Sequence, residues 1–318
     1  MPTPNTLGNS GIFPVSDSVI AAASARLRGG GIVAVPTETV YGLAADASNA
    51  QAVAAIYRTK GRPDFNPLIV HVADRAAAAK LALLDDRANA LADAFWPGPL
   101  TLVLPLVTGA RVAAAVTAGL PTIALRCPAH PAMRQLLDSC GLNLAAPSAN
   151  RSGGISPTRA SHVARSLGEA APMILDGGPC SAGLESTIIA LRLDGWQMLR
   201  HGPVTAVDAE AVLGQPPMPV TSARIEAPGQ LASHYAPSKP LRLNALNAAA
   251  DEWFIGFGDI VGDDSLSLKG DLAQAAARLF DALHIADATD RARIAVAPIP
   301  QTGIGLAIHD RLNRAASG

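Results

Sequence analysis

Short apolar runs alternate along the chain with segments whose apolar positions recur at helical spacing. Ile32–Val35 is such a run, bounded by a triple glycine and a proline, and is typical of a buried strand. Asn49 can cap a helix that ends near Arg58, and a second apolar run, Leu68–Val72, carries one polar residue, His71. The pattern therefore predicts a strand, helix, strand unit at the centre of the N-terminal part of the chain.

The same alternation continues on both sides of this unit. Ser16 or Asp17 can cap a helix that ends at Arg28, where three glycines follow. Further strands are predicted at Leu100–Leu104, Thr122–Cys127, Leu142–Ala146, Met173–Leu175, Ser186–Leu191 and Trp196–Leu199. Further helices are predicted within Asp74–Ala94, over Pro131–Cys140, from Ser156 with Pro157 in the first turn, and up to Leu213. Alternating strands and helices indicate an α/β layered domain.

The clearest break in the chain is the segment GQPPMP at Gly214–Pro219. From there to Lys239 the sequence has no periodicity and several prolines, but it carries histidine and tyrosine, so we interpret it as an ordered linker. A smaller α/β unit follows, with strands predicted at Trp253–Phe257 and Ile294–Ala297 and helices over Asp271–Leu283 and toward Arg314. The predicted organisation is a domain over residues 1–213, a linker or lid segment over 214–238 and a small C-terminal domain over 239–318.

Composition and charge limit the classes of partner. The chain has 318 residues, 49% of them hydrophobic and 16% charged, which predicts one or two folded domains with a substantial core. The formal net charge of −1 lacks the basic excess of proteins that hold long nucleic acids through their phosphates, so no stable nucleic-acid binding is expected. The longest apolar stretches, such as Leu100–Val107, are too short to span a bilayer and contain proline, so no membrane association is expected.

The cysteines and the N-terminus favour a cytoplasmic location. Cys127, Cys140 and Cys180 are far apart and form no C-x-x-C pair, which favours buried thiols in a reducing compartment. The first residues, MPTPNTLGNSGIFPVSD, have neither a cationic start nor an apolar core, so export is not expected.

Side chains at the two turns of the central unit suit a small anionic ligand. A Thr-Glu-Thr cluster follows the first strand, and Arg58, Lys60 and Arg62 lie together at the end of the helix. The sequence has no P-loop motif, so a bound phosphate would be held by arginine, lysine and hydroxyl groups. Arg62 can fork onto phosphate oxygens, while Lys60 can act as a point charge. The alternative is a solvated loop after a helix.

Arg126 and His71 are polar residues in otherwise apolar strands. Burying the guanidinium of Arg126 without a partner would be costly. A carboxylate ligand is one possible partner, and Glu38 or Glu185 in a structural pair is the other. His71 is either a satisfied core histidine or a ligand-binding group.

Metal sites and nucleophile triads are not indicated. The sequence contains no G-x-S-x-G, no H-E-x-x-H and no paired-histidine spacing. The remaining histidines, such as His162 and His284, fall in helical segments and are expected at the surface.

Two long blocks in the N-terminal part resemble a known family. PTETVYGL followed by KGRPDFNPLIVHV is similar to the YrdC-like domain of the threonylcarbamoyl-AMP synthases. LKGDLAQAAARLFDALHIAD and GIGLAIHDRLNRAA resemble the smaller C-terminal domain of the long form of that family. In the linker, many relatives carry S-P-G-M where this chain has Ala227-Pro228-Gly229-Gln230-Leu231, whereas the HYAP segment at His234–Pro237 still matches. The resemblance implies a twisted mixed sheet with flanking helices, followed by a linker and a small Rossmann-like α/β domain.

The resemblance also implies an activity and a set of site residues. The activity is that of an L-threonylcarbamoyladenylate synthase, a nucleotidyltransferase that forms threonylcarbamoyl-AMP and pyrophosphate from L-threonine, bicarbonate or CO2, and ATP accompanied by Mg2+. Positions that match the threonine-binding residues of the family are Thr39, His71, Arg126, Ala146 and Ser186. Positions that match its ATP-binding residues are Arg62, Asn66, Thr122, Ser148, Ser156 and Arg200. Lys60 and Arg62 are the expected catalytic cations, His234 and Tyr235 the expected lid, and His71 a candidate general base.

The implied product serves the threonylcarbamoyl-adenosine modification of tRNA, through transient contact with a downstream threonylcarbamoyl transferase complex. One alternative is a YrdC-like RNA-binding module without adenylate-forming activity, against which the neutral charge and the lack of aromatic stacking motifs argue. The other is a carbamoyl-transfer domain of a larger maturation enzyme, whose acylphosphatase-like and zinc-finger segments this sequence lacks.

Overall fold

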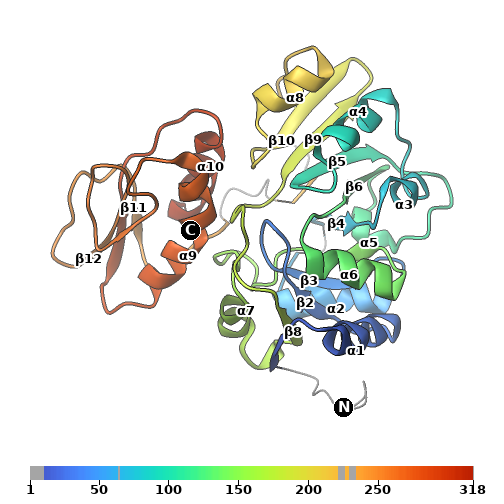
Figure 1. Cartoon of the computed structure of the whole chain (residues 1–318), viewed down its shortest axis with the longest axis horizontal. Helices are drawn as coiled ribbons and strands as arrows, with labels where there is room; N and C mark the ends of the chain where they lie inside the picture. Colours follow the sequence, from blue (N-terminus) through green and yellow to red (C-terminus); the bar gives the residue numbers. More distant parts are fainter. Residues whose placement is uncertain (1–10, 64, 221–225, 229–233, 318) are drawn as a thin grey trace.

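The computed structural model describes residues 11–63, 65–220, 226–228 and 234–317, and within these ranges the strands form two sheets (Figure 1). The larger sheet contains ten strands in the order β1-β8-β2-β3-β7-β4-β6-β5-β9-β10. Their bounds are β1 (Gly11–Pro14), β2 (Val33–Val35), β3 (Gly42–Asp46), β4 (Ile69–His71), β5 (Leu100–Pro105), β6 (Thr122–Arg126), β7 (Leu144–Ala145), β8 (Met173–Asp176), β9 (Thr187–Arg192) and β10 (Gly195–Arg200). Parallel pairs such as β4 with β6 and antiparallel pairs such as β5 with β6 both occur, so the sheet is mixed.

The central unit contains a strand that the sequence pattern did not predict. β3 pairs antiparallel with β2, so the chain forms a hairpin before it enters α2 (Ala50–Lys60). The sequence of β3, GLAAD, has none of the β-branched residues that usually mark a strand. Its pairing with β2 on one side and β7 on the other makes it extended. The hairpin brings the Thr-Glu-Thr cluster to one end of the two strands.

The helix caps follow the sequence pattern closely. In α1 (Asp17–Arg28), the Ser16 hydroxyl accepts a hydrogen bond from the backbone N–H of Val19. Asn49 caps α2 in the same way, and Gly61 ends that helix in the left-handed conformation that glycine adopts without strain. The other helices of this unit are α3 (Arg75–Ala79), α4 (Asp86–Phe95), α5 (Ala114–Thr117), α6 (Pro131–Cys140), α7 (Ala160–Leu167) and α8 (Ala206–Leu213), with the 3-10 helix η1 (Gly168–Ala170) after α7.

The predicted start of a helix at Ser156 is wrong. The helix of this region, α7, begins at Ala160, and Ser156 precedes it in a segment without regular structure. The Ser156 hydroxyl donates a hydrogen bond of 2.5 Å to Glu185 instead of capping a helix. This bond joins segments far apart in the sequence, so the local pattern could not indicate it.

A second, smaller unit follows α8. Its sheet has the order β11-β14-β12-β13, and all its strand pairs are parallel. Its elements are β11 (Leu241–Arg242), β12 (Glu252–Gly256), β13 (Asp264–Ser265), α9 (Leu272–Asp287), β14 (Arg293–Val296) and α10 (Gly305–Ala316). The predicted fold class is thus confirmed: a large mixed α/β sheet with flanking helices, followed by a small Rossmann-like α/β unit. Within the described residues, no helix combines the length and apolar character needed to cross a bilayer.

The predicted linker over 214–238 is only partly described. Residues 221–225 and 229–233, which include Gln230, lie outside the described residues. The domain boundaries after residues 213 and 238 stay predictions.

The two units share an apolar core at their junction, with α9 and α10 on the side of the small unit that faces the large one (Figure 1). Val40, Ile155 and Leu184 of the large unit pack into the apolar cluster that surrounds Phe280 of α9. Gly183 lies so close to α9 that any side chain there would meet its backbone. The two units therefore pack closely against each other at this junction.

The expectation that His162 and His284 lie at the surface is wrong. Both are buried at the junction, and their rings stack with centroids 3.8 Å apart. His284 Nε2 lies 3.2 Å from the carbonyl oxygen of Ser156, and His162 Nε2 lies 3.5 Å from Asp281. Both rings thus lie in the contact between α7 and α9, which the local sequence could not indicate.

Alanine at Gly183 should loosen this junction. Gly183 has a φ of +67°, and an added Cβ would lie 2.3 Å from the carbonyl oxygen of Ala277. Gly141 provides a control, because it has a φ of +66° and nothing within 4 Å of an added Cβ. We expect Gly141→Ala to lower the free energy of unfolding by the backbone strain alone, about 1–2 kcal/mol, and Gly183→Ala to lower it by at least about 1 kcal/mol more. Urea unfolding measures both, and equal losses would contradict the contact.

The histidine pair should make the protein less stable in mild acid. Burial lowers the pKa of His162 to about 3 and that of His284 to about 4, whereas an unfolded histidine titrates near pH 6.5. Below about pH 6.5 the unfolded chain therefore binds protons that the folded chain does not, and stability falls as the pH drops toward 4. We expect the pair to account for a loss of about 4 kcal/mol between pH 7 and pH 5, about 2 kcal/mol for each histidine. A His162→Gln/His284→Gln variant should show a flatter pH dependence in urea unfolding; an unchanged slope would show that other groups cause it.

Candidate active site

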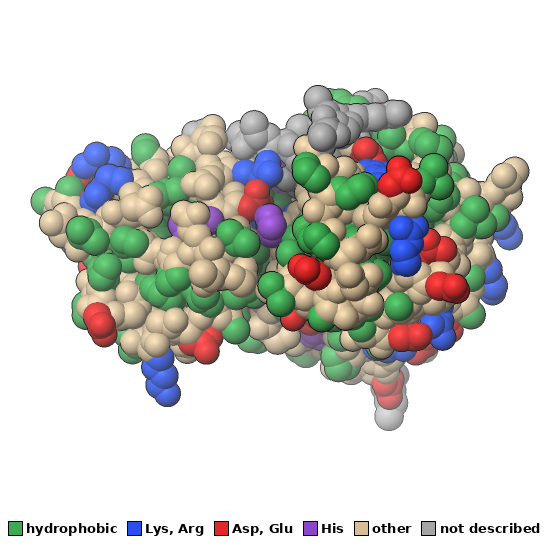
Figure 2. All heavy atoms as spheres, turned by 90° about the horizontal axis from the view of Figure 1, so that it is seen from above, with side chains coloured by type: hydrophobic (Ala, Val, Ile, Leu, Met, Phe, Trp, Pro, Cys, Tyr) green, Lys and Arg blue, Asp and Glu red, His purple; other side chains and the backbone are tan. Residues whose placement is uncertain are grey.

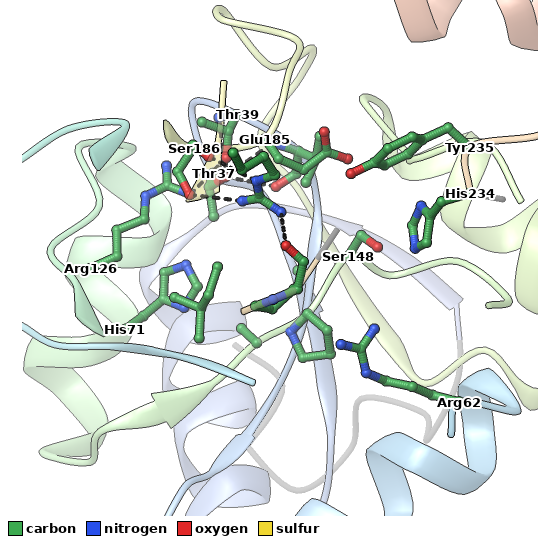
Figure 3. Close-up of a pocket in the computed structure, with 17 residues that line it drawn as sticks. Thr37, Thr39, Arg62, His71, Arg126, Ser148, Glu185, Ser186, His234 and Tyr235 are labelled. Atoms are coloured by element: carbon green, nitrogen blue, oxygen red, sulfur yellow. Dashed lines mark hydrogen bonds between the residues drawn. The ribbon is translucent and has the colours of Figure 1, made fainter. Parts of the chain in front are cut away.

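One cavity lies between the strand ends of the larger sheet and the chain that leads to the small unit. It is lined from the turn after β2, from β4 and β6, from the loop after β7, and from the segments at the start of β9 and the end of β10. Figure 3 shows Arg126 and His71 on one side and Arg62, His234 and Tyr235 on the other. The predicted site residues that line it are Thr39, Arg62, His71, Arg126, Ala146, Ser148, Ser186, Arg200, His234 and Tyr235.

Arg126 is the charged residue on the side of the cavity that also holds His71. Its Nη2 lies 2.7 Å from Glu38 Oε1, its Nη1 donates to the Thr39 hydroxyl at 2.8 Å, and its Nε donates to the Gly98 carbonyl. Of the two carboxylates considered as partners, Glu38 is therefore the one that pairs with Arg126. Burial alone would raise the pKa of Glu38, but Arg126 and the backbone N–H of Ala129 hold it below its usual value. Glu38 is therefore ionised, and its contact with Arg126 helps to hold the guanidinium in the cavity wall.

His71 lies beside Arg126 on the neighbouring strand and is neutral. Burial, together with the positive charge of Arg126, lowers the pKa of His71 to about 3. Its Nδ1 is buried and has no hydrogen-bond partner among the described residues. A group with so low a pKa is a poor general base near pH 7, but it offers a polar atom to a ligand.

Ser186 is held between two polar neighbours at the start of β9. Its hydroxyl lies 2.7 Å from the Thr101 hydroxyl and accepts a hydrogen bond from Arg200 Nη2 at 3.1 Å. Arg200 also donates from Nε to the Ser186 carbonyl and from Nη1 to the Pro228 carbonyl. This network fixes Arg200, which is itself buried, against the wall of the cavity.

The opposite side of the cavity, which holds Arg62, His234 and Tyr235, is positively charged. Arg62 donates to the carbonyl oxygens of Asn66 and Pro67, at 3.4 and 3.1 Å. Burial lowers the pKa of Arg62 to about 10, so it is charged at neutral pH. Among the described residues, neither Arg62 nor Arg200 forms an ion pair with a carboxylate. Both guanidinium groups thus remain available to a ligand with several negative charges.

Four predicted site residues do not line the cavity, namely Lys60, Asn66, Thr122 and Ser156. Lys60 is buried behind it, and its Nζ donates to the carbonyl oxygens of Ser148 and Asn150, both at 2.6 Å. Asn66 accepts from Arg62 through its carbonyl. Ser156 is bonded to Glu185, and Thr122 lies at the start of β6.

Several lining residues were not predicted from the sequence. Thr37 folds the turn after β2, because its hydroxyl donates to the Val40 carbonyl and accepts from the N–H groups of Thr39 and Val40. The Thr-Glu-Thr cluster indicated a turn there but not the inclusion of Thr37 in the site. Glu185 carried only the signal of a carboxylate just before a predicted strand. Nothing local marks Pro147 or Pro228 as lining residues.

The carboxylates near the cavity are already engaged. Glu38 contacts Arg126 with one oxygen and accepts from the N–H groups of Ala129 and His130 with the other. Glu185 accepts from Ser156 and from Arg311. In the described part of the chain, no group of three His, Cys, Asp or Glu side chains is arranged to hold a metal.

Comparisons with known proteins cover almost the whole chain. Residues 25–202 match the family model Sua5_yciO_yrdC, described as Telomere recombination, and residues 204–317 match the model of the C-terminal domain of threonylcarbamoyl-AMP synthase. The threonylcarbamoyl-AMP synthase of Bacillus subtilis (strain 168) is 40% identical over 329 residues, which cover 95% of this chain and 94% of that protein. That of Pyrococcus abyssi is 37% identical, covering 93% of this chain and 94% of that protein. The crystal structure of P. abyssi Sua5 complexed with L-threonine matches with a TM-score of 0.87 at 35% identity, over 97% of this chain and 98% of that chain.

The fold and the relatives together show the class of protein: the chain is a YrdC-like enzyme of the nucleotidyltransferase type. Within that class, it belongs to the threonylcarbamoyl-AMP synthase family, in the long form that carries the additional C-terminal domain. The resemblance that the sequence blocks indicated is confirmed.

Loss of Arg126 should destabilise the protein strongly. Arg126→Met would leave Glu38 buried and ionised without its partner, and removal of one member of a buried pair costs about 3–5 kcal/mol. Arg75→Met serves as the control, because Arg75 pairs with Asp93 at the surface, where the two side chains are 50% and 67% exposed. We expect a loss of about 0.5 kcal/mol or less there. Chemical denaturation compares the two variants, and a similar small loss in both would show that the buried pair contributes little.

Proposed function

We propose that this protein is an L-threonylcarbamoyladenylate synthase, which converts L-threonine, bicarbonate or CO2, and MgATP into threonylcarbamoyl-AMP and pyrophosphate. The observation that carries the proposal is the two-sided cavity: it has a polar end centred on Arg126 and a cationic end with Arg62 and Arg200, which donate to backbone carbonyl oxygens. The first suits an amino acid and the second a triphosphate. The P. abyssi relative that matches over 97% of this chain has been crystallised with L-threonine.

Threonine would occupy the polar end. Arg126 lines this end of the cavity, and its guanidinium would bind the substrate carboxylate, with the hydroxyls of Thr39 and Ser186 beside it. The unpartnered Nδ1 of His71 would take a hydrogen bond from the substrate amine or hydroxyl. Ala146 would contact the substrate methyl group, a contact that discriminates only modestly against serine.

ATP would occupy the cationic end, with Arg62, Arg200 and Ser148 in contact with it. Asn66 and Ser156 would act through the side chains that they hold, Arg62 and Glu185. Lys60 would act through the loop that carries Ser148, because its Nζ already donates to two carbonyl oxygens of that loop. Thr122, also expected at the nucleotide, starts the strand that ends in Arg126.

The chemistry needs no covalent intermediate on the enzyme. The neutral amine of threonine forms a carbamate by adding to CO2 with release of a proton to solvent, or by condensing with bicarbonate with loss of water. A carbamate oxygen then attacks the α-phosphorus, and the bond from that phosphorus to the bridging oxygen breaks as pyrophosphate leaves. Arg62 would stabilise the charge that develops on the phosphates, and the fixed positions of the three reactants would lower the entropic cost of bringing them together. His234 and Tyr235 line the cavity from the linker and would act as the lid that keeps water from the carbamate.

The product would pass to a threonylcarbamoyl transferase complex for tRNA modification, by transient contact. The RNA-binding alternative is less well supported: acidic and basic side chains are interspersed on the face seen in Figure 2. A long phosphate chain is usually bound by a basic surface. The three cysteines are free and buried, which agrees with the proposed cytoplasmic location.

Pyrophosphate release tests the proposal. Release from MgATP should require both L-threonine and bicarbonate, and release that is indifferent to them, or absent, would overturn the assignment. Arg62→Ala should raise the KM for ATP at least about tenfold, since a charge-assisted contact to phosphate is lost, and should leave threonine binding nearly unchanged. Arg58→Ala is the matched control, because Arg58 lies four residues earlier, in the last turn of α2, and is exposed. Equal effects of the two variants would exclude a specific role for Arg62.

A further inference from the structure

Glu185 is the one carboxylate among the described residues that line the cavity. It is buried, and both of its oxygens are engaged, one by the Ser156 hydroxyl at 2.5 Å and the other by Arg311 Nε at 2.9 Å. Burial alone would raise the pKa of Glu185, but Arg311, Arg200 and Ser156 hold it below its usual value. An ionised carboxylate thus stands in a cavity whose other charges are positive.

Arg311 comes from the small unit, on α10, and is completely buried. Besides Glu185, it donates from Nη1 to Asp310 at 2.7 Å, and Asp310 in turn pairs with Arg314. Its guanidinium carbon lies 5.4 Å from the ring centroid of Tyr235, which is within cation–π range. One side chain of the C-terminal unit therefore contacts both a lining carboxylate and a lining aromatic ring.

We propose that Arg311 is a positioning residue of the nucleotide site, supplied by the C-terminal unit, which neutralises Glu185 and supports Tyr235 so that a nucleoside triphosphate can bind. The inference rests on the function proposed above. Without Arg311, the unpaired charge of Glu185 would repel the phosphates through a medium of low dielectric, where such repulsion is strong. The C-terminal unit would then be required for ATP affinity and not only for stability.

A second ion pair across the same junction provides a control, because it joins the two units without contacting the cavity. Arg159, just before α7, binds Asp281 of α9 through two hydrogen bonds of 2.6 and 3.2 Å. It joins the same two units, but neither Arg159 nor Asp281 lines the cavity. If Arg311 only attached the units, the loss of either arginine would have the same consequences.

The experiment compares Arg311→Met, Arg159→Met and the double variant Arg311→Met/Glu185→Gln in the full chain. Isothermal titration with MgATP and, separately, with L-threonine gives the two affinities, and thermal unfolding gives the stability of each variant. We expect Arg311→Met to weaken ATP binding at least tenfold with threonine binding changed less than about twofold, and Arg159→Met to leave both affinities unchanged. The double variant should recover most of the ATP affinity, because the repelling charge is gone. Arg311→Lys, which keeps the positive charge, should retain part of the ATP affinity.

Three outcomes would overturn the inference. Equal ATP affinities in Arg311→Met and the wild type would do so, as would equal losses in Arg311→Met and Arg159→Met. An unrecovered double variant whose thermal stability matches the wild type would also contradict it. A wild-type protein that binds no ATP at all would contradict the proposed function and this inference together. If the wild type binds ATP, the variants test the role of Arg311 alone.

Discussion

Ionised side chains buried at a ligand cavity must have partners, because a charge removed from water without one destabilises the fold by several kcal/mol. In this protein two such pairs surround the cavity: Glu38 with Arg126, and Glu185 with Arg311. The first joins the β2–β3 turn to β6, and the second joins the segment before β9 to α10. Each pair brings together segments far apart in the sequence, so the cavity acquires its charge pattern only when the chain is fully folded.

The balance of these charges accounts for the chemistry that the cavity supports. Both nearby carboxylates are neutralised by arginines, while Arg62 and Arg200 donate to backbone carbonyl oxygens and keep their charge available. His71 and His234 have their pKa values lowered to about 3 by burial, helped by neighbouring cations, and are neutral. The result is a cavity with a net positive field and neutral hydrogen-bonding groups, suited to anionic reactants whose binding does not depend on histidine protonation near neutral pH.

The C-terminal unit is tied to the cavity by more than one kind of contact. Val40, which lines the cavity, also belongs to the apolar cluster of the small unit, and the stacked pair of His162 and His284 lies in the same junction. Tyr235 lines the cavity and packs against Phe280 of α9, with ring centroids 5.5 Å apart. Movement of the small unit would therefore disturb the cavity wall. This coupling gives a physical reason for the two units to act together.

The sequence by itself determined the elements whose signals are local. The caps of α1 and α2, the apolar strands β2 and β4 and the break after α8 all follow from neighbouring residues. The blocks PTETVYGL and KGRPDFNPLIVHV were enough to indicate the family and most of the residues that line the cavity. Only the tertiary structure decided that β3 is a strand, that Ser156 holds Glu185 rather than a helix end, and that His162 and His284 are buried. It also decided which carboxylate pairs with Arg126. Such pairing depends on which distant segments fold against one another, and the residues that neighbour Arg126 in the sequence do not indicate it.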